Sequence, residues 1–346
     1  MGGACIVNAL KDYAMAHTSG LEPAAPPPAR TVILASPRGF CAGVRHAVDL
    51  AQAVLARRPH PVYGLKEIVH NRQVVNDLCR QGLRFVQDIA DVPHGHTVLF
   101  SAHGVPPAVR ETAVARGLEV IDATCPFVMK VHLEVRRFAQ KGYTIALIGH
   151  RRHDEVIGVA GEAPDRVVVL ETAEEAAAFL PPDPERVAVV TQTTLSQEEA
   201  DRVLTILKHR FPRLETPVKK DICYATTNRQ EAVKTLARQA GLILVLGAEN
   251  SSNSRRLAEV AVAEGAEAHL VSRLDDLAGI PLGARETIGI TAGASTPESF
   301  IRDILDLLGR QGFTRVQELE VVHEAIHFAL PPHLRGPTSG PVSAKP

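Results

Sequence analysis

Three cysteines share one local setting that suits metal binding. Cys41, Cys125 and Cys223 each follow a short β-branched run, lie in a turn of small residues and precede a stretch with helical periodicity. A thiolate at a helix N-terminus has a depressed pKa and is a good ligand for soft metals. Three thiolates without an obvious fourth favour an iron–sulfur cluster with one open iron. Two alternatives are ordinary packing of buried cysteines and a zinc site assembled from distant loops, since no Cys-x-x-Cys pair is present.

Histidines and one carboxylate occur in equivalent turns. His70, His103, His150 and His153 all follow predicted strands, and Glu155 lies two residues after His153. Imidazoles directed into a cleft bind anions or transfer protons, although a histidine in such a turn often only makes local hydrogen bonds. Glu155 becomes a proton donor if burial raises its pKa; alternatively it is an acid that stabilises a helix N-terminus.

Three loops are rich in hydroxyl and amide side chains. Residues 191–196, 250–254 and 291–296 each lie between a predicted strand and a predicted helix. Ser, Thr and Asn are common helix N-caps, but several such loops together also form a donor-rich cradle for phosphate. Neither a Gly-x-Gly-x-x-Gly fingerprint nor a phosphate-loop Gly-Lys-Ser is present, so a dinucleotide or ATP is not indicated.

The elements that must position these side chains alternate between strand and helix, which predicts an α/β fold with parallel sheets covered on both faces. The ten predicted strands are too many for one small sheet and indicate two or three lobes. In such folds, ligands bind beyond the carboxyl ends of the strands. The predicted strands are residues 31–35, 61–65, 97–101, 118–121, 144–148, 166–170, 186–190, 242–246, 268–271 and 287–290, and the longest predicted helices are 127–140, 197–210, 228–239, 254–264 and 297–309.

Composition excludes several classes of protein. The 346 residues include 38 basic and 39 acidic side chains, so no overall basic field exists to bind nucleic acid or an anionic membrane surface. No apolar run approaches the ~20 residues needed to cross a membrane. The N-terminal 30 residues do not resemble a signal peptide, and the scattered cysteines suit a reduced, cytoplasmic setting. Cys5 lies within these N-terminal 30 residues. Cys79 is expected to lie in a helix and to pack in the hydrophobic core.

As an ordered set, nine segments resemble the 4-hydroxy-3-methylbut-2-enyl diphosphate reductase (IspH/LytB) family. The resemblance extends from residue 31 to about residue 335 and implies three α/β lobes with small, mainly parallel sheets around a central [4Fe-4S] cluster. Cys41, Cys125 and Cys223 would hold that cluster and leave one iron open. The matching segments are 37–44, 69–72, 100–105, 122–126, 153–156, 191–196, 221–231, 251–253 and 291–295.

The expected organisation follows from the same resemblance. It consists of a disordered lead-in (1–30), lobes at 31–122, 123–221 and 222–315, a C-terminal segment packing on the core (316–335) and a disordered tail (336–346). The chain departs from the usual family pattern at Arg45-His46, at Lys66-Glu67-Ile68 and at Asp154, where proline is usual.

The resemblance also implies the chemistry. The family reductively removes a hydroxyl from an allylic diphosphate, which yields isopentenyl and dimethylallyl diphosphate. Glu155 would donate the proton with Thr193 and His153, and electrons would come from an external ferredoxin or flavodoxin. Alternatives are an iron–sulfur sensor without turnover and a zinc hydrolase. The side chains expected to bind the substrate are His70, His103, His153, Thr193, Ser251, Ser252, Asn253 and Ser295.

Overall fold

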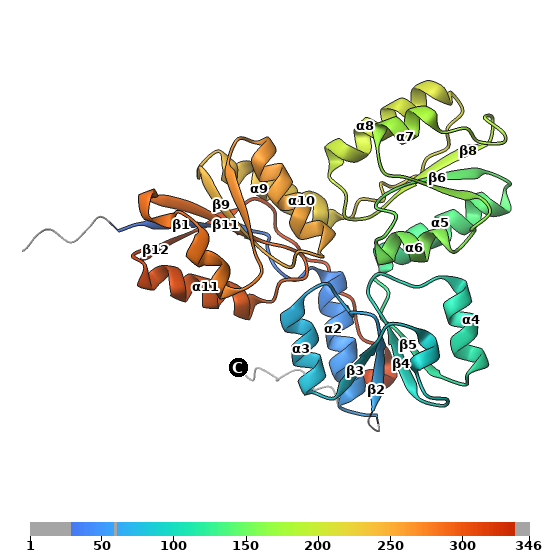
Figure 1. The fold of residues 1–346 in the computed structure, drawn as a ribbon, viewed down its shortest axis with the longest axis horizontal. Coiled ribbons are helices and arrows are strands. Elements are labelled where there is room, and N and C mark those ends of the chain that lie inside the picture. The colour runs from blue at the N-terminus through green and yellow to red at the C-terminus, as the bar shows by residue number, and fades with distance from the viewer. Residues whose placement is uncertain (1–28, 59–60, 336–346) are drawn as a thin grey trace, which may run out of the picture.

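Three small parallel sheets, each covered by helices on both faces, make up the fold (Figure 1). The computed structural model describes residues 29–58 and 61–335, so the expectations for Cys5, for residues 1–28 of the lead-in and for the tail at 336–346 lie outside the described residues. All pairings in the three sheets are parallel, which confirms the expected fold class. Within the part of the chain that the structure describes, no helix is both long and apolar enough to cross a bilayer.

The first lobe contains a four-stranded sheet in the order β3-β2-β4-β5. Helices α2 and α3 pack on one face, and α4 with a short 3-10 turn, η1, packs on the other. The end of the described chain returns to this lobe, where Leu334 packs beside α2. The elements are α2 (Ala42–Leu55), β2 (Val62–Leu65), α3 (Arg72–Arg80), β3 (Leu83–Val86), η1 (Ile89–Asp91), β4 (Thr97–Phe100), α4 (Pro107–Ala115), β5 (Glu119–Asp122) and η4 (Pro332–Leu334).

The second lobe contains a three-stranded sheet in the order β7-β6-β8. Helices α5 and α6 cover one face, and α7 and α8 cover the other. Helix α8 begins where the Ser196 hydroxyl accepts a hydrogen bond from the Glu199 amide, as an N-cap should. The elements are α5 (Pro126–Gln140), β6 (Thr144–Ile148), α6 (Asp154–Ala160), β7 (Val167–Leu170), α7 (Ala173–Ala178), β8 (Val187–Thr191) and α8 (Gln197–Arg210).

The third lobe contains a five-stranded sheet in the order β10-β9-β11-β1-β12. Every residue of β9 is buried, because α9 and α10 cover one face of the sheet and α11 covers the other. The elements are β1 (Thr31–Ser36), α9 (Tyr224–Ala237), β9 (Leu242–Leu246), α10 (Ser252–Ala263), β10 (Glu267–Val271), η2 (Leu274–Gly279), η3 (Leu282–Ala284), β11 (Thr287–Ala292), α11 (Glu298–Arg310) and β12 (Arg315–Glu320).

Several details differ from the sequence-based expectation. Strand β1 pairs with β11 and β12, so it belongs to the third sheet, whereas residues 31–36 were expected in the first lobe. Strands β3 and β12 form where no strand was predicted. Cys79 does lie in a helix, but it is exposed, because α3 turns Val74 and Leu78 toward the core instead.

Candidate functional site

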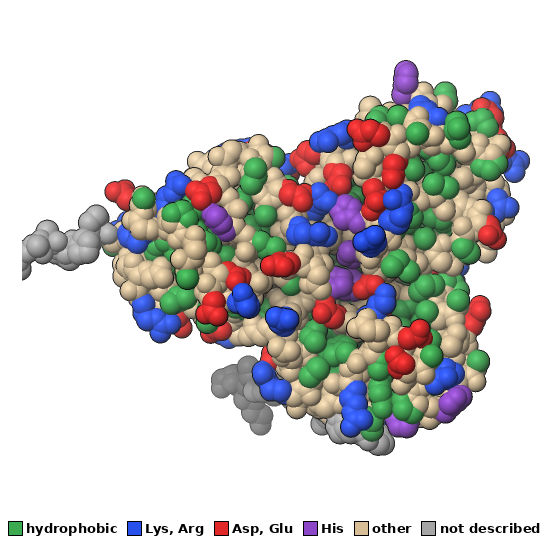
Figure 2. Space-filling view, viewed as in Figure 1, with side chains coloured by type: hydrophobic (Ala, Val, Ile, Leu, Met, Phe, Trp, Pro, Cys, Tyr) green, Lys and Arg blue, Asp and Glu red, His purple; other side chains and the backbone are tan. Residues whose placement is uncertain are grey.

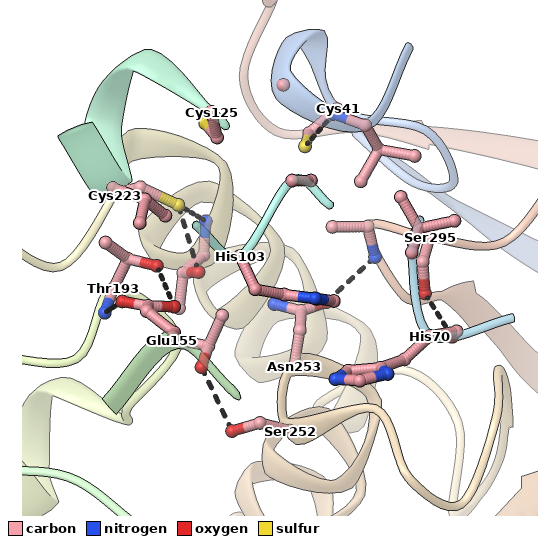
Figure 3. A pocket seen from close by; sticks show the side chains of 18 of the residues that line it. Cys41, His70, His103, Cys125, Glu155, Thr193, Cys223, Ser252, Asn253 and Ser295 are labelled. Carbon is pink, nitrogen blue, oxygen red and sulfur yellow. Dashed lines mark hydrogen bonds between the residues drawn. The ribbon is translucent and has the colours of Figure 1, made fainter. Parts of the chain in front are cut away.

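The three cysteines predicted to bind metal are the N-caps of three helices that begin at the centre of the molecule. Cys41 precedes α2, Cys125 precedes α5 and Cys223 precedes α9. Cys41 Sγ accepts a hydrogen bond from the Val44 amide, and Cys223 Sγ accepts one from the Thr226 amide, each at 3.4 Å. All three sulfurs line one pocket (Figure 3), so residues far apart in sequence present their thiols to one space.

The thiols are close enough to influence one another. A Cβ atom added at Gly43 would lie 2.5 Å from Cys125 Sγ and 3.9 Å from Cys41 Sγ, so the start of α2 lies against both sulfurs. Burial, reinforced by the charges of the neighbouring thiols, raises the pKa of Cys125 to about 12. Burial and the charge of Cys41 raise the pKa of Cys223 to about 11.

This donor set fits an iron–sulfur centre. Thiols with such raised pKa values stay protonated at neutral pH unless a cation replaces their protons, and a coordinated metal does so. The described cysteines are all free, so disulfide formation does not consume the three sulfurs. Thiolate ligands from loops at helix N-termini are the type that iron–sulfur clusters require.

Glu155 lies in the same pocket and is almost completely buried, with 2% of its surface exposed. Its two carboxylate oxygens accept hydrogen bonds from the amide and hydroxyl of Thr193, at 2.7 and 2.9 Å. These hydrogen bonds favour the ionised form, but burial is the larger effect and raises the pKa of Glu155 to about 7. The side chain therefore carries a transferable proton near neutral pH.

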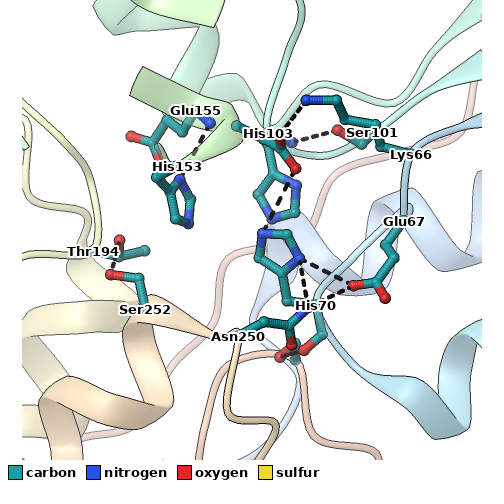
Figure 4. A network of polar contacts seen from close by, with 12 residues as sticks. Lys66, Glu67, His70, Ser101, His103, His153, Glu155, Thr194, Asn250 and Ser252 are labelled. Carbon is teal, nitrogen blue, oxygen red and sulfur yellow. Dashed lines mark hydrogen bonds and ion pairs between the residues drawn. The ribbon is translucent and has the colours of Figure 1, made fainter. Parts of the chain in front are cut away.

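Three histidine rings form a cluster at the polar end of the pocket (Figure 4). The rings of His70 and His103 stack with centroids 4.0 Å apart, and His153 lies edge-on to both at 5.4 and 5.5 Å. His153 Nδ1 accepts a hydrogen bond from the Glu155 amide, which leaves Nε2 as the donor of a neutral ring. Burial lowers the pKa of His153 to about 3 and lowers that of His103 well below its usual range. The rings of His103 and His153 are thus neutral donors at pH 7.

The third lobe contributes the start of α10 and the loop after β11. Ser251 is the N-cap of α10, and the Ser252 hydroxyl accepts a hydrogen bond from Thr194 at 3.0 Å. Asn253 Oδ1 accepts from the Ala294 amide at 2.8 Å, whereas Nδ2 is buried without a partner. The Ser295 hydroxyl donates to the His70 carbonyl at 2.9 Å. An unpaired buried donor such as Asn253 Nδ2 is costly unless a ligand accepts its hydrogen bond.

The structure brings the predicted metal ligands, catalytic residues and substrate-binding residues to one pocket, whereas His150 lines an adjacent opening. In Figure 2, histidine side chains are visible in the hollow where the three lobes meet. The predicted residues that line the pocket are Cys41, Cys125, Cys223, His70, His103, His153, Glu155, Thr193, Ser251, Ser252, Asn253 and Ser295.

Sequence reasoning did not single out the pocket's apolar wall or two of its hydroxyls. Val44, Phe127 and Val128 line the part near the sulfurs. Thr194 and Thr226 also line the pocket, and each lies close in sequence to a residue that was singled out. The signal for Phe127 was its position in the first turn of the helix that Cys125 caps.

For the zinc alternative, the described residues contain one candidate set of ligands, which lies at the pocket mouth. Ligand atoms of His70, His103 and Asp154 lie within 4.8 Å of one another. However, the ammonium of Lys66 already forms an ion pair with Asp154. A cation at this position would have to compete with the Lys66 ammonium, so this group of side chains is better suited to binding an anion.

Fold and site together define a class: a three-lobed parallel α/β protein with a thiol-lined central pocket whose other end is rich in neutral donors. Residues 32–309 match the model of the LytB protein family. The chain belongs to the LytB family, and that membership implies an iron–sulfur centre.

Named relatives and solved structures agree with this membership. The chain is 49% identical over 313 residues to the 4-hydroxy-3-methylbut-2-enyl diphosphate reductase of Acidothermus cellulolyticus, covering 90% of this chain and 92% of the relative. It is 47% identical to the 4-hydroxy-3-methylbut-2-enyl diphosphate reductase 2 of Mycobacterium tuberculosis, covering 90% of this chain and 93% of the relative. The solved E-1-hydroxy-2-methyl-but-2-enyl-4-diphosphate reductase of Plasmodium falciparum superimposes with a TM-score of 0.85 at 36% identity, covering 89% of this chain and 97% of that one.

Proposed function

We propose that this chain is an oxidoreductase that converts (E)-4-hydroxy-3-methylbut-2-enyl diphosphate to isopentenyl and dimethylallyl diphosphate. Two electrons and two protons are consumed, the C4–oxygen bond breaks, and the oxygen leaves as water. A solved structure described as the terminal enzyme of the non-mevalonate pathway shares 34% of its sequence with this chain and has a TM-score of 0.59. The reaction is therefore assigned to the last step of that isoprenoid pathway.

The observation that carries the proposal is the buried carboxyl of Glu155 in the same pocket as three convergent thiols. Hydroxide is a poor leaving group, so a proton must reach the departing oxygen. With a pKa of about 7, Glu155 holds that proton at neutral pH and still releases it readily. The amide and hydroxyl of Thr193 orient the carboxyl, and His153 adjoins it through the Glu155 amide.

The diphosphate would bind at the opposite, polar end of the pocket. Its oxygens are acceptors, and the ring N–H groups of His70, His103 and His153 are donors that converge from two lobes. Hydroxyls and the unpaired amide of Asn253 approach from the third lobe. Helix α10 begins at this end, so its N-terminus also favours a bound anion. The remaining donors of this set are Thr193, Ser251, Ser252 and Ser295.

Cys41, Cys125 and Cys223 would hold one [4Fe-4S] cluster per chain with one iron free of protein ligands. When bound, such a cluster supplies electrons and Lewis-acid assistance to the departing oxygen. Val44, Phe127 and Val128 exclude water from this end of the pocket, and they offer an apolar surface to the hydrocarbon part of the substrate.

Electrons would come from outside the chain, from a small carrier of ferredoxin or flavodoxin type, and the enzyme would work in the cytoplasm. Each lobe would contribute one thiol, with divisions near residues 122 and 221. This division is supported by the three separate sheets, apart from β1, which lies in the third.

The test is anaerobic turnover of the allylic diphosphate with a chemical reductant, together with iron counting. The wild-type protein should be brown, contain about four irons per chain and form both products. Glu155→Gln should keep the cluster spectrum and lose most turnover, because the amide has a similar shape but no transferable proton. Glu264→Gln, on the exposed end of α10, serves as the matched control and should retain activity.

Two results would overturn the proposal. A colourless protein with stoichiometric zinc, prepared without oxygen exposure, would favour the hydrolase. A loaded protein that binds the diphosphate but never turns it over would favour the sensor. The named relatives support neither alternative, since they are reductases.

A further inference from the structure

One ion pair joins the first and second lobes at the pocket mouth. The Lys66 ammonium, in the loop after β2, contacts Asp154 Oδ1 at the start of α6. Both side chains are partly shielded, with 39% of Lys66 and 19% of Asp154 exposed. In the part of the chain that the structure describes, this is the only Lys or Arg ion pair between residues 61–122 and residues 126–220.

The pair connects the segments that carry the polar end of the site. Lys66 lies four residues before His70 on one loop, and Asp154 lies between His153 and Glu155 on the other. Asp154 Oδ2 also lies 4.0 Å from His70 Nε2, so one carboxylate of the second lobe faces two groups of the first. Asp154 therefore lies between the start of α6 and the loop that carries His70.

The backbone of Lys66 shows that the residue is not placed there by conformational preference. Its φ of 56° is in the left-handed region, and no other described residue except glycine has a positive φ. Glycine is the residue that adopts such a φ without strain. The Lys66 amide donates to the Val86 carbonyl at 2.8 Å, which holds the turn against β3 while the side chain extends to Asp154.

Neither member of the pair lines the thiol-containing pocket itself. Asp154 lines the adjacent opening together with His70, His153, Arg152 and Arg255, and Lys66 lines neither space. The ammonium is also already neutralised by Asp154. These placements argue for an indirect role.

We propose that Lys66 and Asp154 are positioning residues whose ion pair sets the spacing between His70 in the first lobe and His153 and Glu155 in the second. The inference rests on the proposed function, because the substrate's diphosphate is the ligand that these histidines would share. A bound diphosphate itself connects the two lobes. Loss of the ion pair should therefore weaken binding more than it slows the saturated enzyme.

The test is a double-mutant cycle in the cluster-loaded protein with Lys66→Met, Asp154→Asn and the double variant. Each single variant should raise KM for the allylic diphosphate, and Kd for inorganic diphosphate, by about twofold to fivefold, the range of partly exposed ion pairs. The value of kcat should stay within about twofold. The KM and Kd of the double variant should be no higher than those of either single variant, because the second substitution removes a side chain whose ion-pair partner is already gone.

Lys234→Met and Glu198→Gln provide the matched control, because they break an ion pair between α9 and α8 that lies away from the pocket. Neither should change KM or Kd. The proposal is wrong if the fold-changes multiply in the double variant, since the two residues then act independently. It is also wrong if Lys66→Met alone abolishes diphosphate binding, since the ammonium would then contact the ligand directly.

The Kd for inorganic diphosphate is measured by calorimetric titration. This measurement keeps the test of the ion pair separate from the test of the proposed reaction. A wild-type protein without turnover would refute the proposed reaction. The double-mutant cycle, measured as Kd for inorganic diphosphate, would still decide whether the ion pair supports anion binding.

Discussion

Replacing Gly43 by alanine tests whether the three thiols act as one site. The added methyl group would lie 2.5 Å from Cys125 Sγ and 3.3 Å from Cys125 Cβ. Ordinary non-bonded contacts are about 3.5–4.0 Å, so the sulfur must move by roughly 1 Å. Metal–ligand distances tolerate only about 0.2 Å, so this displacement exceeds what a shared cluster permits.

The same change should leave the protein folded. Overpacking of this kind costs about 1–3 kcal/mol, which is less than the 5–15 kcal/mol by which domains are usually stable. Alanine is also the better helix former at a position within α2. We therefore expect Gly43→Ala to lose most of its iron while keeping a cooperative thermal transition.

Iron and sulfide per chain, visible absorption and thermal melting after anaerobic reconstitution are the measurements. Gly309→Ala is the control, because a Cβ there meets nothing within 4 Å and the residue lies in α11. That variant should bind iron normally and gain up to about 1 kcal/mol of stability. Wild-type iron content and spectrum in Gly43→Ala would refute the idea that Cys41 and Cys125 hold one group beside this helix turn.

Four further predictions concern the thiols, the buried acid and a buried arginine. Cys41→Ser should lose the visible cluster spectrum, whereas Cys79→Ser should not, because Cys79 is exposed on α3; iron counting distinguishes them. Turnover should fall as pH rises through about 7, where Glu155 loses its proton, and a rate that is flat from pH 6 to 8.5 would contradict that role. Because the folded-state pKa is raised from 4.5, stability should also decline by about 3 kcal/mol as pH rises from 4.5 to above 7, and melting of Glu155→Gln should lack this decline. Glu324→Ala should destabilise the fold by about 3–5 kcal/mol, measured by denaturant unfolding, because it leaves the fully buried Arg229 without its carboxylate.

The local elements of the site were predictable because its turns have strong local signals. Each cysteine follows a β-branched run and opens an amphipathic stretch, so its place at a helix N-terminus was visible in the sequence. The ten predicted strands all form, as apolar runs in parallel sheets usually do.

Pairing between distant segments was not predictable in the same way. Strand β12 (Arg315–Glu320) is polar and mostly exposed, so it lacks the apolar signal of the other strands. It pairs with β1, at the opposite end of the described chain, and no local pattern specifies such a partner. The exposure of Cys79 was missed for a related reason: it is one residue beyond the buried Leu78, and a helix turns about 100° per residue.

The ion pair between Lys66 and Asp154 shows the same limit within the site. Each residue was noticeable as a departure from the usual family pattern, but they lie 88 positions apart. Only the packing of the first lobe against the second shows that they contact each other. Sequence reasoning thus predicted which loops carry candidate ligands and donors, while the contacts between loops needed the structure.

The charge distribution in the pocket suggests why its donors are mostly neutral. The substrate and both products carry the same diphosphate, so strong binding of that group would stabilise all of them equally and would not accelerate the reaction. Burial keeps His103 and His153 neutral, and Asp154 neutralises the nearest ammonium, Lys66. In the proposed function, the neutral histidines and the hydroxyls that line the pocket would hold the anion through hydrogen bonds that are numerous but individually weak. In the proposed function, the discrimination that accelerates the reaction would then come from the other end of the pocket, where Glu155 would supply a proton to the departing oxygen and the three cysteines would hold the iron–sulfur centre.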